Sequence, residues 1–212
     1  RHELPERMGV SHFLEHMFFR GSEKHPDTVR MNALVEAAGG NLNGVTTRDH
    51  GYYYTPISPA ELEVGFDVLG DMLVRPLLLE LETERQIILE EMLDEVDEQG
   101  RDIDLDNLSK LALFEGHGLS HKIAGTPRTV RRLGLQDLVE HHQLMYRGGN
   151  LVVACAGPIT HAQVMELATG AFGGLPPGGG PLDQPVPAHP AGPAVLLIDH
   201  EDSPQTEMRL NF

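Results

Sequence analysis

Two histidines, His12 and His16, constrain both the fold and the chemistry of this chain through their spacing. Apolar residues recur around them as in an amphipathic helix, which we expect to follow a short loop, with Ser11 as its N-cap. Residues i and i+4 of a helix lie one turn apart on the same face, so the two imidazoles can bind one small cation. The apolar residues are Phe13, Leu14, Met17 and Phe18.

Glu15 adds a carboxylate to the pair, because it follows His12 by three residues and lies on nearly the same helical face. Zinc favours nitrogen and sulfur ligands in a tetrahedral array and keeps one position open in catalytic sites. It also lowers the pKa of a bound water molecule to about 7, and a nearby carboxylate can accept that proton. The segment from His12 to His16 therefore predicts a catalytic Zn²⁺ site with Glu15 as its base.

A third zinc ligand is needed, and the best candidates lie in a long acidic helix that we expect over residues 82–99. Glu84 and Glu91 are two turns apart and share a face of this helix, and Glu90 lies beside Glu91. A carboxylate at the edge of a packed face is costly unless it is paired or metal-bound, which favours a ligand among them. The spacing does not choose between the three. The residues expected to face the core are Ile87, Ile88, Met92 and Leu93.

The remaining periodicity predicts an α+β fold, with a mainly antiparallel sheet and helices packed on one face in two layers. We expect three domain segments: a zinc-bearing domain over residues 1–175, a Pro/Gly-rich linker over 176–193, and the start of a second domain over 194–212. Helices are expected over 28–38, 60–74, 105–114, 135–146 and 161–172. Strands are expected over 42–47, 51–57, 151–157, 194–199 and 207–212.

Charge and composition exclude several classes of partner. With 16 Lys and Arg against 32 Asp and Glu, the net charge is −16, which argues against nucleic acid. No apolar run approaches the roughly 20 residues that span a bilayer, so we expect no membrane span. The single cysteine, Cys155, excludes an internal disulfide and is expected to be buried in the strand at 151–157. The sequence does not indicate a compartment.

Three segments together resemble the pitrilysin (M16) family of inverzincins, which includes the mitochondrial processing peptidases. The first runs from Gly9 to Met17 around the His12–His16 motif, and the second is Glu84-Arg85-x-x-Ile88-Leu89-Glu90-Glu91. The third runs from Gly39 to Tyr53 and resembles the strand pair on which the family binds substrate. The resemblance extends over about the whole chain and is to the N-terminal half of such a peptidase.

The resemblance implies a role for each matching residue. His12, His16 and Glu91 correspond to the family's zinc ligands, Glu15 to its general base, and Glu84 to the carboxylate that orients the site. Asn43 corresponds to a residue beside the scissile bond, on an edge strand that receives the substrate, and Gly44 stands where the family usually has Ala.

The expected function is therefore zinc-dependent hydrolysis of peptide bonds in a peptide or unfolded polypeptide. The alternative is a non-catalytic M16-like subunit that binds peptides or supports assembly. In either case the resemblance implies a second M16-like half or subunit as partner, in a homodimer or a heterodimer.

Overall fold

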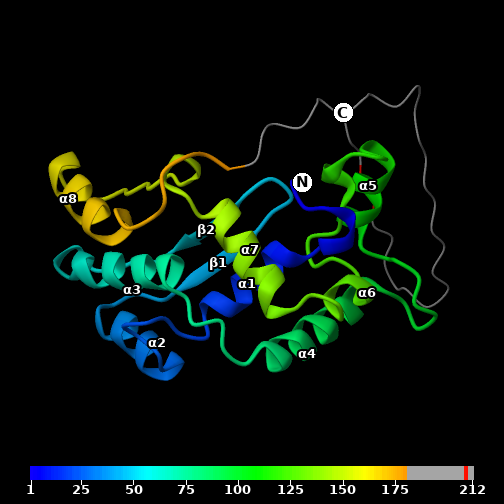
Figure 1. Ribbon diagram of the computed structural model, residues 1–212, viewed down its shortest axis with the longest axis horizontal. Helices are drawn as coiled ribbons and strands as arrows, with labels where there is room; N and C mark the ends of the chain where they lie inside the picture. The colour runs from blue at the N-terminus through cyan, green and yellow to red at the C-terminus, as the bar shows by residue number, and fades with distance from the viewer. Residues whose placement is uncertain (181–207, 210–212) are drawn as a thin grey trace.

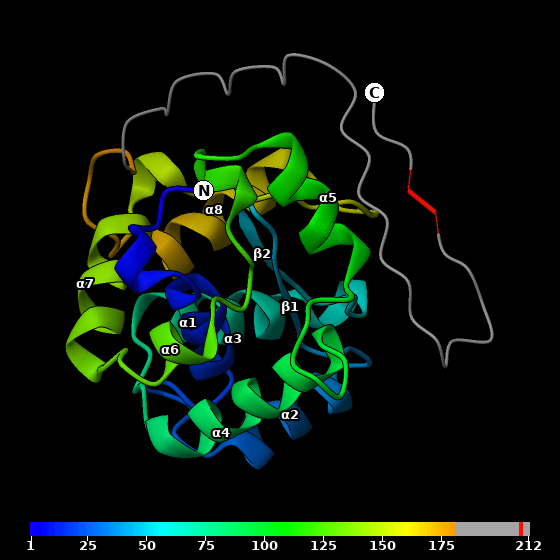
Figure 2. The same cartoon turned by 90° about the vertical axis from the view of Figure 1, so that its right-hand side faces the viewer.

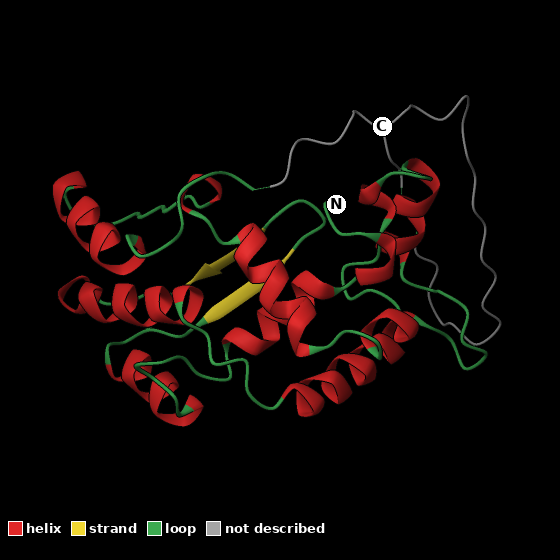
Figure 3. Ribbon diagram, viewed as in Figure 1, coloured by secondary structure: helices red, strands yellow, loops and turns green. Residues whose placement is uncertain are grey.

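The computed structural model describes residues 1–180 together with Met208 and Arg209 (Figure 1). A two-stranded antiparallel hairpin lies among helices, and the secondary structure is mapped in Figure 3. The strands are β1 (Asn43–Thr46) and β2 (Gly51–Tyr54). The helices are α1 (Val10–Phe18), α2 (Thr28–Ala37), α3 (Leu62–Val74), α4 (Leu81–Glu91), α5 (Leu105–Leu113), α6 (Pro127–Val130), α7 (Leu135–Met145) and α8 (His161–Phe172).

One face of the hairpin is covered by helices and the other is open. Tyr53 points inward, where its ring centroid lies 5.3 Å from that of Phe18 on α1. Its neighbours Tyr52 and Tyr54 are 45% and 47% exposed, as expected from the alternation of side chains along a strand. Because α1 packs against β1 as well as against α4 and α7, the α+β class with helices on one face is confirmed (Figure 2).

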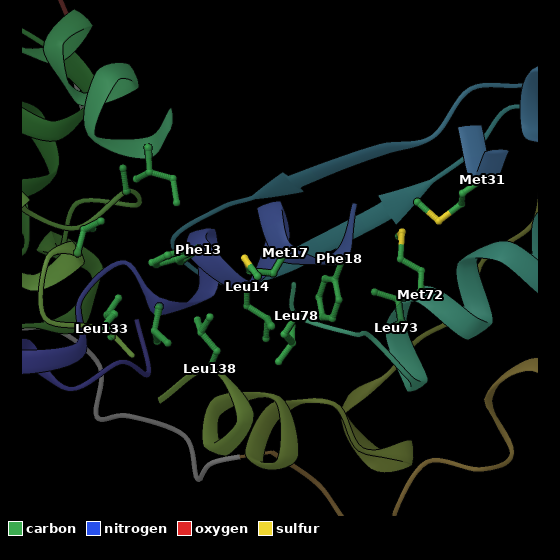
Figure 4. Packing of buried hydrophobic residues seen from close by; sticks show 14 of the residues in the cluster. Phe13, Leu14, Met17, Phe18, Met31, Met72, Leu73, Leu78, Leu133 and Leu138 are labelled. Carbon is green, nitrogen blue, oxygen red and sulfur yellow. The ribbon is translucent and has the colours of Figure 1, made fainter. Parts of the chain in front are cut away.

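The hydrophobic core is centred on α1 (Figure 4). Five of the nine residues of this helix are buried, at positions that follow the i, i+3, i+4, i+7, i+8 pattern of one helical face. Partners from the neighbouring helices include Ile88 of α4 and Leu138 of α7. This packing leaves the other side of α1 for its polar residues. The buried residues of α1 are Val10, Phe13, Leu14, Met17 and Phe18.

The expectation that Ser11 caps α1 is wrong. The residue before the helix is Gly9, whose φ of 92° favours glycine, and a Cβ there would lie 2.4 Å from the carbonyl oxygen of Ala124. The carboxylate of Glu3 caps the helix instead, accepting hydrogen bonds of 2.8 Å from the backbone N–H groups of Gly9 and Ser11. The Ser11 hydroxyl is then free to contact Nε2 of His141 on α7, at 2.9 Å. Glu3, which lies six residues before Gly9, therefore supplies the cap.

Helix α4 ends earlier than the sequence predicts. It stops at Glu91 and is followed by a 3₁₀ turn over Met92–Glu95, whereas we expected a helix to residue 99. The carboxylate of Asp97 accepts hydrogen bonds from the backbone N–H groups of Gln99 and Arg101, at 3.0 and 2.8 Å. Such local bonds give residues 97–101 an alternative to the helix, so the helix does not continue to residue 99.

The buried face of α4 also differs in part from the prediction. Ile88 and Met92 are buried as expected, but Ile87 and Leu93 are 37% and 62% exposed. Glu84 lies on the buried face, four residues before Ile88. The helix is therefore turned so that an acidic residue, rather than Ile87, faces α1.

Residues 151–157 do not form the expected strand. The segment has no strand pairing in the described part of the chain, Val152 is 90% exposed, and Cys155 is exposed rather than buried. It borders a cavity of about 710 Å³ whose other walls include β2 and α3. An apolar, β-branched run favours an extended backbone, but a strand also requires a neighbour with which to exchange hydrogen bonds.

Several expectations fall outside the described residues. Of the linker over 176–193 only residues 176–180 are described, and the strand expected over 194–199 is not described at all. Of the strand expected over 207–212, only Met208 and Arg209 are described. No helix in the described ranges is both long and apolar enough to cross a bilayer.

Protonation of His141 is expected to oppose folding. Burial lowers the pKa of this side chain from 6.5 to about 4, so the unfolded chain binds its proton more readily than the folded chain. Stability is therefore lost as the pH falls from about 6.5 towards 4. We expect His141→Asn to flatten the decline of the free energy of unfolding between pH 7.5 and pH 5, measured by urea unfolding. The same substitution at the exposed His161 should leave the decline unchanged, and equal slopes in both variants would contradict the assignment.

Candidate metal centre

Helices α1 and α4 bring two histidines and one carboxylate together. His12, His16 and Glu91 each offer a ligand atom, and these atoms all lie within 4.8 Å of one another. An oxygen of Glu91 is 3.4 Å from Nε2 of His16 and 3.9 Å from Nε2 of His12. Within residues 1–180 and the described pair 208–209, no other group of His, Cys, Asp or Glu meets this criterion.

The Nε2 atoms of both imidazoles lie towards the carboxylate of Glu91. Nδ1 of His16 lies 2.9 Å from a carboxylate oxygen of Glu84, which can only accept, so Nδ1 carries the proton and Nε2 is free. Burial, together with the neighbouring His16, lowers the pKa of His12 to about 4. His12 is therefore a neutral imidazole at neutral pH, which is the form that binds a metal.

Glu84 supports the centre without belonging to it. Its side chain is almost fully buried, and besides His16 it binds the guanidinium of Arg20 through its other oxygen. His16 and Arg20 are one turn apart on the α1 side of the interface, so a single carboxylate from α4 pairs with both. The contact with Arg20 is not among the sequence-based predictions. The position of Arg20, four residues after His16, would have indicated that it lies near the same carboxylate.

The geometry separates the three carboxylates that spacing alone left open. Glu91 joins the two histidines, Glu84 holds His16 from behind, and Glu90 is exposed and belongs to neither arrangement. Glu84 and Glu91 share a face of α4 because they are seven residues apart. They lie two turns apart along the helix axis, so they meet different residues of α1.

Glu15 lies on the same side of α1 and contacts the hairpin. Its Oε2 accepts a hydrogen bond from the hydroxyl of Thr46, the last residue of β1. Close by, the hydroxyls of Tyr53 and Tyr146 share a hydrogen bond of 2.8 Å. Burial raises the pKa of both tyrosines, so each keeps its proton at neutral pH. Neither Thr46 nor Tyr146 is predicted from the sequence to be a site residue.

Asn43 and Gly44 lie at the start of the same strand. Gly44 packs so closely on α1 that an added Cβ would be 3.0 Å from the ring of Phe19. Asn43 donates a hydrogen bond of 3.3 Å to the carbonyl of Asn41. The structure therefore places both residues on the strand that supports Glu15, and neither is in contact with the histidines.

The large cavity does not include the three candidate ligands. It is lined by β2, by α3 and by residues 151–155, and Thr46, Tyr53 and Tyr146 also border it, whereas His12, His16 and Glu91 are not among its walls. The chemistry of the ligand atoms, rather than cavity size, therefore identifies the candidate site. Two imidazole nitrogens and one carboxylate oxygen form a set of donors that suits Zn²⁺.

Comparison with known proteins gives consistent matches. Residues 1–127 match the family described as Insulinase (Peptidase family M16), and residues 132–212 match the one described as Peptidase M16 inactive domain. The chain is 31% identical to the mitochondrial-processing peptidase subunit beta of Blastocladiella emersonii, over 99% of this chain and 44% of that protein. It is 34% identical to the human cytochrome b-c1 complex subunit 1, over 83% of this chain and 36% of that protein.

A protease from Helicobacter pylori has a similar fold in its crystal structure, with a TM-score of 0.74 and 23% identity. The match covers 89% of this chain and 45% of that protease. The chain thus spans less than half the length of these relatives.

The burial of Glu84 makes it important for stability. We expect Glu84→Gln to lower the free energy of unfolding by about 2 kcal/mol, because a buried charge-assisted hydrogen bond is lost and Arg20 keeps only the exposed Glu80 as an acidic partner. Urea unfolding measures the change. Glu90→Gln on the same helix is the matched control, and because Glu90 is exposed its substitution should have no measurable effect. Equal stability of the two variants would contradict this reading.

Proposed function

The chain belongs to peptidase family M16, and on this premise we propose that it is the metal-bearing portion of a zinc metalloendopeptidase. One observation carries the proposal: His12, His16 and Glu91 converge within 4.8 Å, beside Glu15 on the same helix. A carboxylate next to a set of zinc ligands is the arrangement that hydrolysis by an activated water molecule requires.

Each residue of the centre has a defined task in this proposal. His12, His16 and Glu91 hold the zinc ion. When bound, zinc polarises the scissile carbonyl and lowers the pKa of water to about 7. Glu15 accepts the proton of the attacking water and later delivers it to the leaving amine. Glu84 keeps the imidazole of His16 in one tautomer and orientation through the 2.9 Å contact with Nδ1.

The substrate proposed for this centre is an extended peptide or unfolded polypeptide. Strand β1 pairs with β2 along one edge, and its other edge has no strand partner in the described part of the chain. An extended peptide can satisfy such an edge as an added strand. Asn43 and Gly44 would then contact the substrate. They lie on the same strand as Thr46, which contacts Glu15.

We further propose that a second M16-like half or subunit completes the enzyme. The relatives described above are more than twice as long as the matched region, and two of them are named as subunits. A partner of this kind would cover the substrate edge and supply further contacts to the peptide.

A non-catalytic subunit is the second candidate, because the chain is also 34% identical to the cytochrome b-c1 complex subunit 1. The presence of His12, Glu15, His16 and Glu91 favours the enzyme. Metal content discriminates between the two: an enzyme binds one zinc ion per chain in this centre, whereas a scaffold needs none.

Substitution of the proposed base tests the mechanism. We expect Glu15→Gln, made in the full-length protein with its partner half or subunit, to lower kcat on internally quenched peptides by about 10²–10⁴-fold. Zinc should remain bound, because Glu15 is not a ligand, and elemental analysis would show this. Full activity of the variant would exclude Glu15 as the base and the mechanism with it.

Substitution of the proposed third ligand tests the metal centre separately. Glu91→Gln replaces a carboxylate with a weaker donor, and we expect zinc affinity, measured by competition with a chromogenic chelator, to fall by at least about 100-fold. Glu90→Gln should bind zinc like the unmodified protein. If the two variants bound zinc equally, Glu91 would not be the third ligand. If the unmodified protein bound none, the non-catalytic alternative would be favoured.

A further inference from the structure

A hydrogen bond joins the Thr46 hydroxyl to the Glu15 carboxylate across 31 residues of sequence. Thr46 is the last residue of β1 and pairs with Gly51 at the end of the hairpin ladder. Glu15 lies on the polar side of α1, between the two candidate ligands in sequence. The contact therefore ties the hairpin directly to the residue proposed as the general base.

The bond occupies only one of the two carboxylate oxygens. Thr46 donates to Oε2, and Oε1 of Glu15 has no hydrogen-bond partner among the described residues. The terminal torsion of a Glu side chain is soft, so a carboxylate without a contact samples many orientations. A donor fixed on Oε2 restricts that rotation and leaves Oε1 as the oxygen available to accept a proton.

Thr46 is itself held in place. Threonine is β-branched and stiff at χ1, so its hydroxyl has little freedom once the strand is fixed. The strand ends in a turn closed by a 2.8 Å hydrogen bond from the backbone N–H of Thr47 to the carbonyl of His50. Arg48 in that turn binds Asp106 and, at 2.6 Å, Asn107 of α5. The donor thus sits on a hairpin fastened at its tip to a separate helix.

We propose that Thr46 is a positioning residue, whose hydroxyl holds the carboxylate of Glu15 so that Oε1 faces the attacking water. The inference rests on the proposed function, since it concerns the base of that reaction. It also adds a task for β1: the strand proposed to bind the peptide at Asn43 and Gly44 also orients the base. Thr46 acts through Glu15 and needs no contact with the substrate.

Thr46→Val removes the hydroxyl and keeps the shape of the side chain. In the full-length protein assayed on internally quenched peptides, we expect kcat to fall about 10- to 100-fold. KM should change less than about twofold, because only transition-state stabilisation is lost. Zinc content should not change, and Thr46→Ser, which restores the donor, should recover most of kcat. Thr46→Ala is a second variant without the donor, in case valine crowds the face beside Glu15.

Thr47→Val is the matched control. Thr47 lies in the same turn, and its hydroxyl donates to the carbonyl of His50 at 2.7 Å rather than to Glu15. We expect this variant to retain kcat within about twofold. An equal loss in the Thr46 and Thr47 variants would show a general effect on the hairpin and overturn the inference.

A spectroscopic measurement separates the contact from activity. In metal-free protein labelled with ¹³C at the Glu side-chain carboxyl, the Glu15 signal is the one missing in Glu15→Gln. We expect that signal to shift in Thr46→Val and to stay in place in Thr47→Val. An unmoved signal, or unchanged kcat in Thr46→Val while Glu15→Gln is inactive, would overturn this inference alone. Full activity of Glu15→Gln would instead overturn the proposed function.

Discussion

The burial of one side of α1 is the constraint on which the rest of the structure depends. A helix of nine residues is too short to be stable alone in water, so its helicity depends on packing. Each buried side chain, such as Phe13, Leu14 or Phe18, contributes about 1.5–3 kcal/mol when removed from water. Because that side faces the core, the chemically active residues of α1 lie on its other side, where His16 contacts Glu84 of α4 and Glu15 contacts Thr46 of β1.

The interface between α1 and α4 combines stability with orientation of the candidate ligands. Burying the Glu84 carboxylate is costly, and the cost is offset by the contacts with His16 Nδ1 and with the Arg20 guanidinium. The same contact with His16 fixes its tautomer and turns Nε2 towards Glu91. A change in the packing of α4 would therefore affect the folding energy and the metal centre together.

The polar side of α1 shows a comparable coupling to the hairpin through Glu15. Strand β1 packs on α1 closely enough that Gly44 leaves little space beside Phe19. Two residues later along the same face, Thr46 reaches Glu15. The α1 helix thus lies between two elements that each contact one of its chemically active residues: α4 contacts His16, and β1 contacts Glu15.

The sequence alone determined the α+β class, the hairpin, the amphipathic α1 and the shortlist of carboxylates, because these follow from local periodicity. Tertiary structure decided what depends on how elements meet: that Glu84 pairs with Arg20, that Glu3 caps α1, and that Thr46 contacts Glu15. It also decided two features that differ from the sequence-based prediction: the early end of α4 and the unpaired segment 151–157. Spacing along a chain determines which residues share a face of a helix or strand. Packing determines which atoms of the neighbouring elements are in contact with that face.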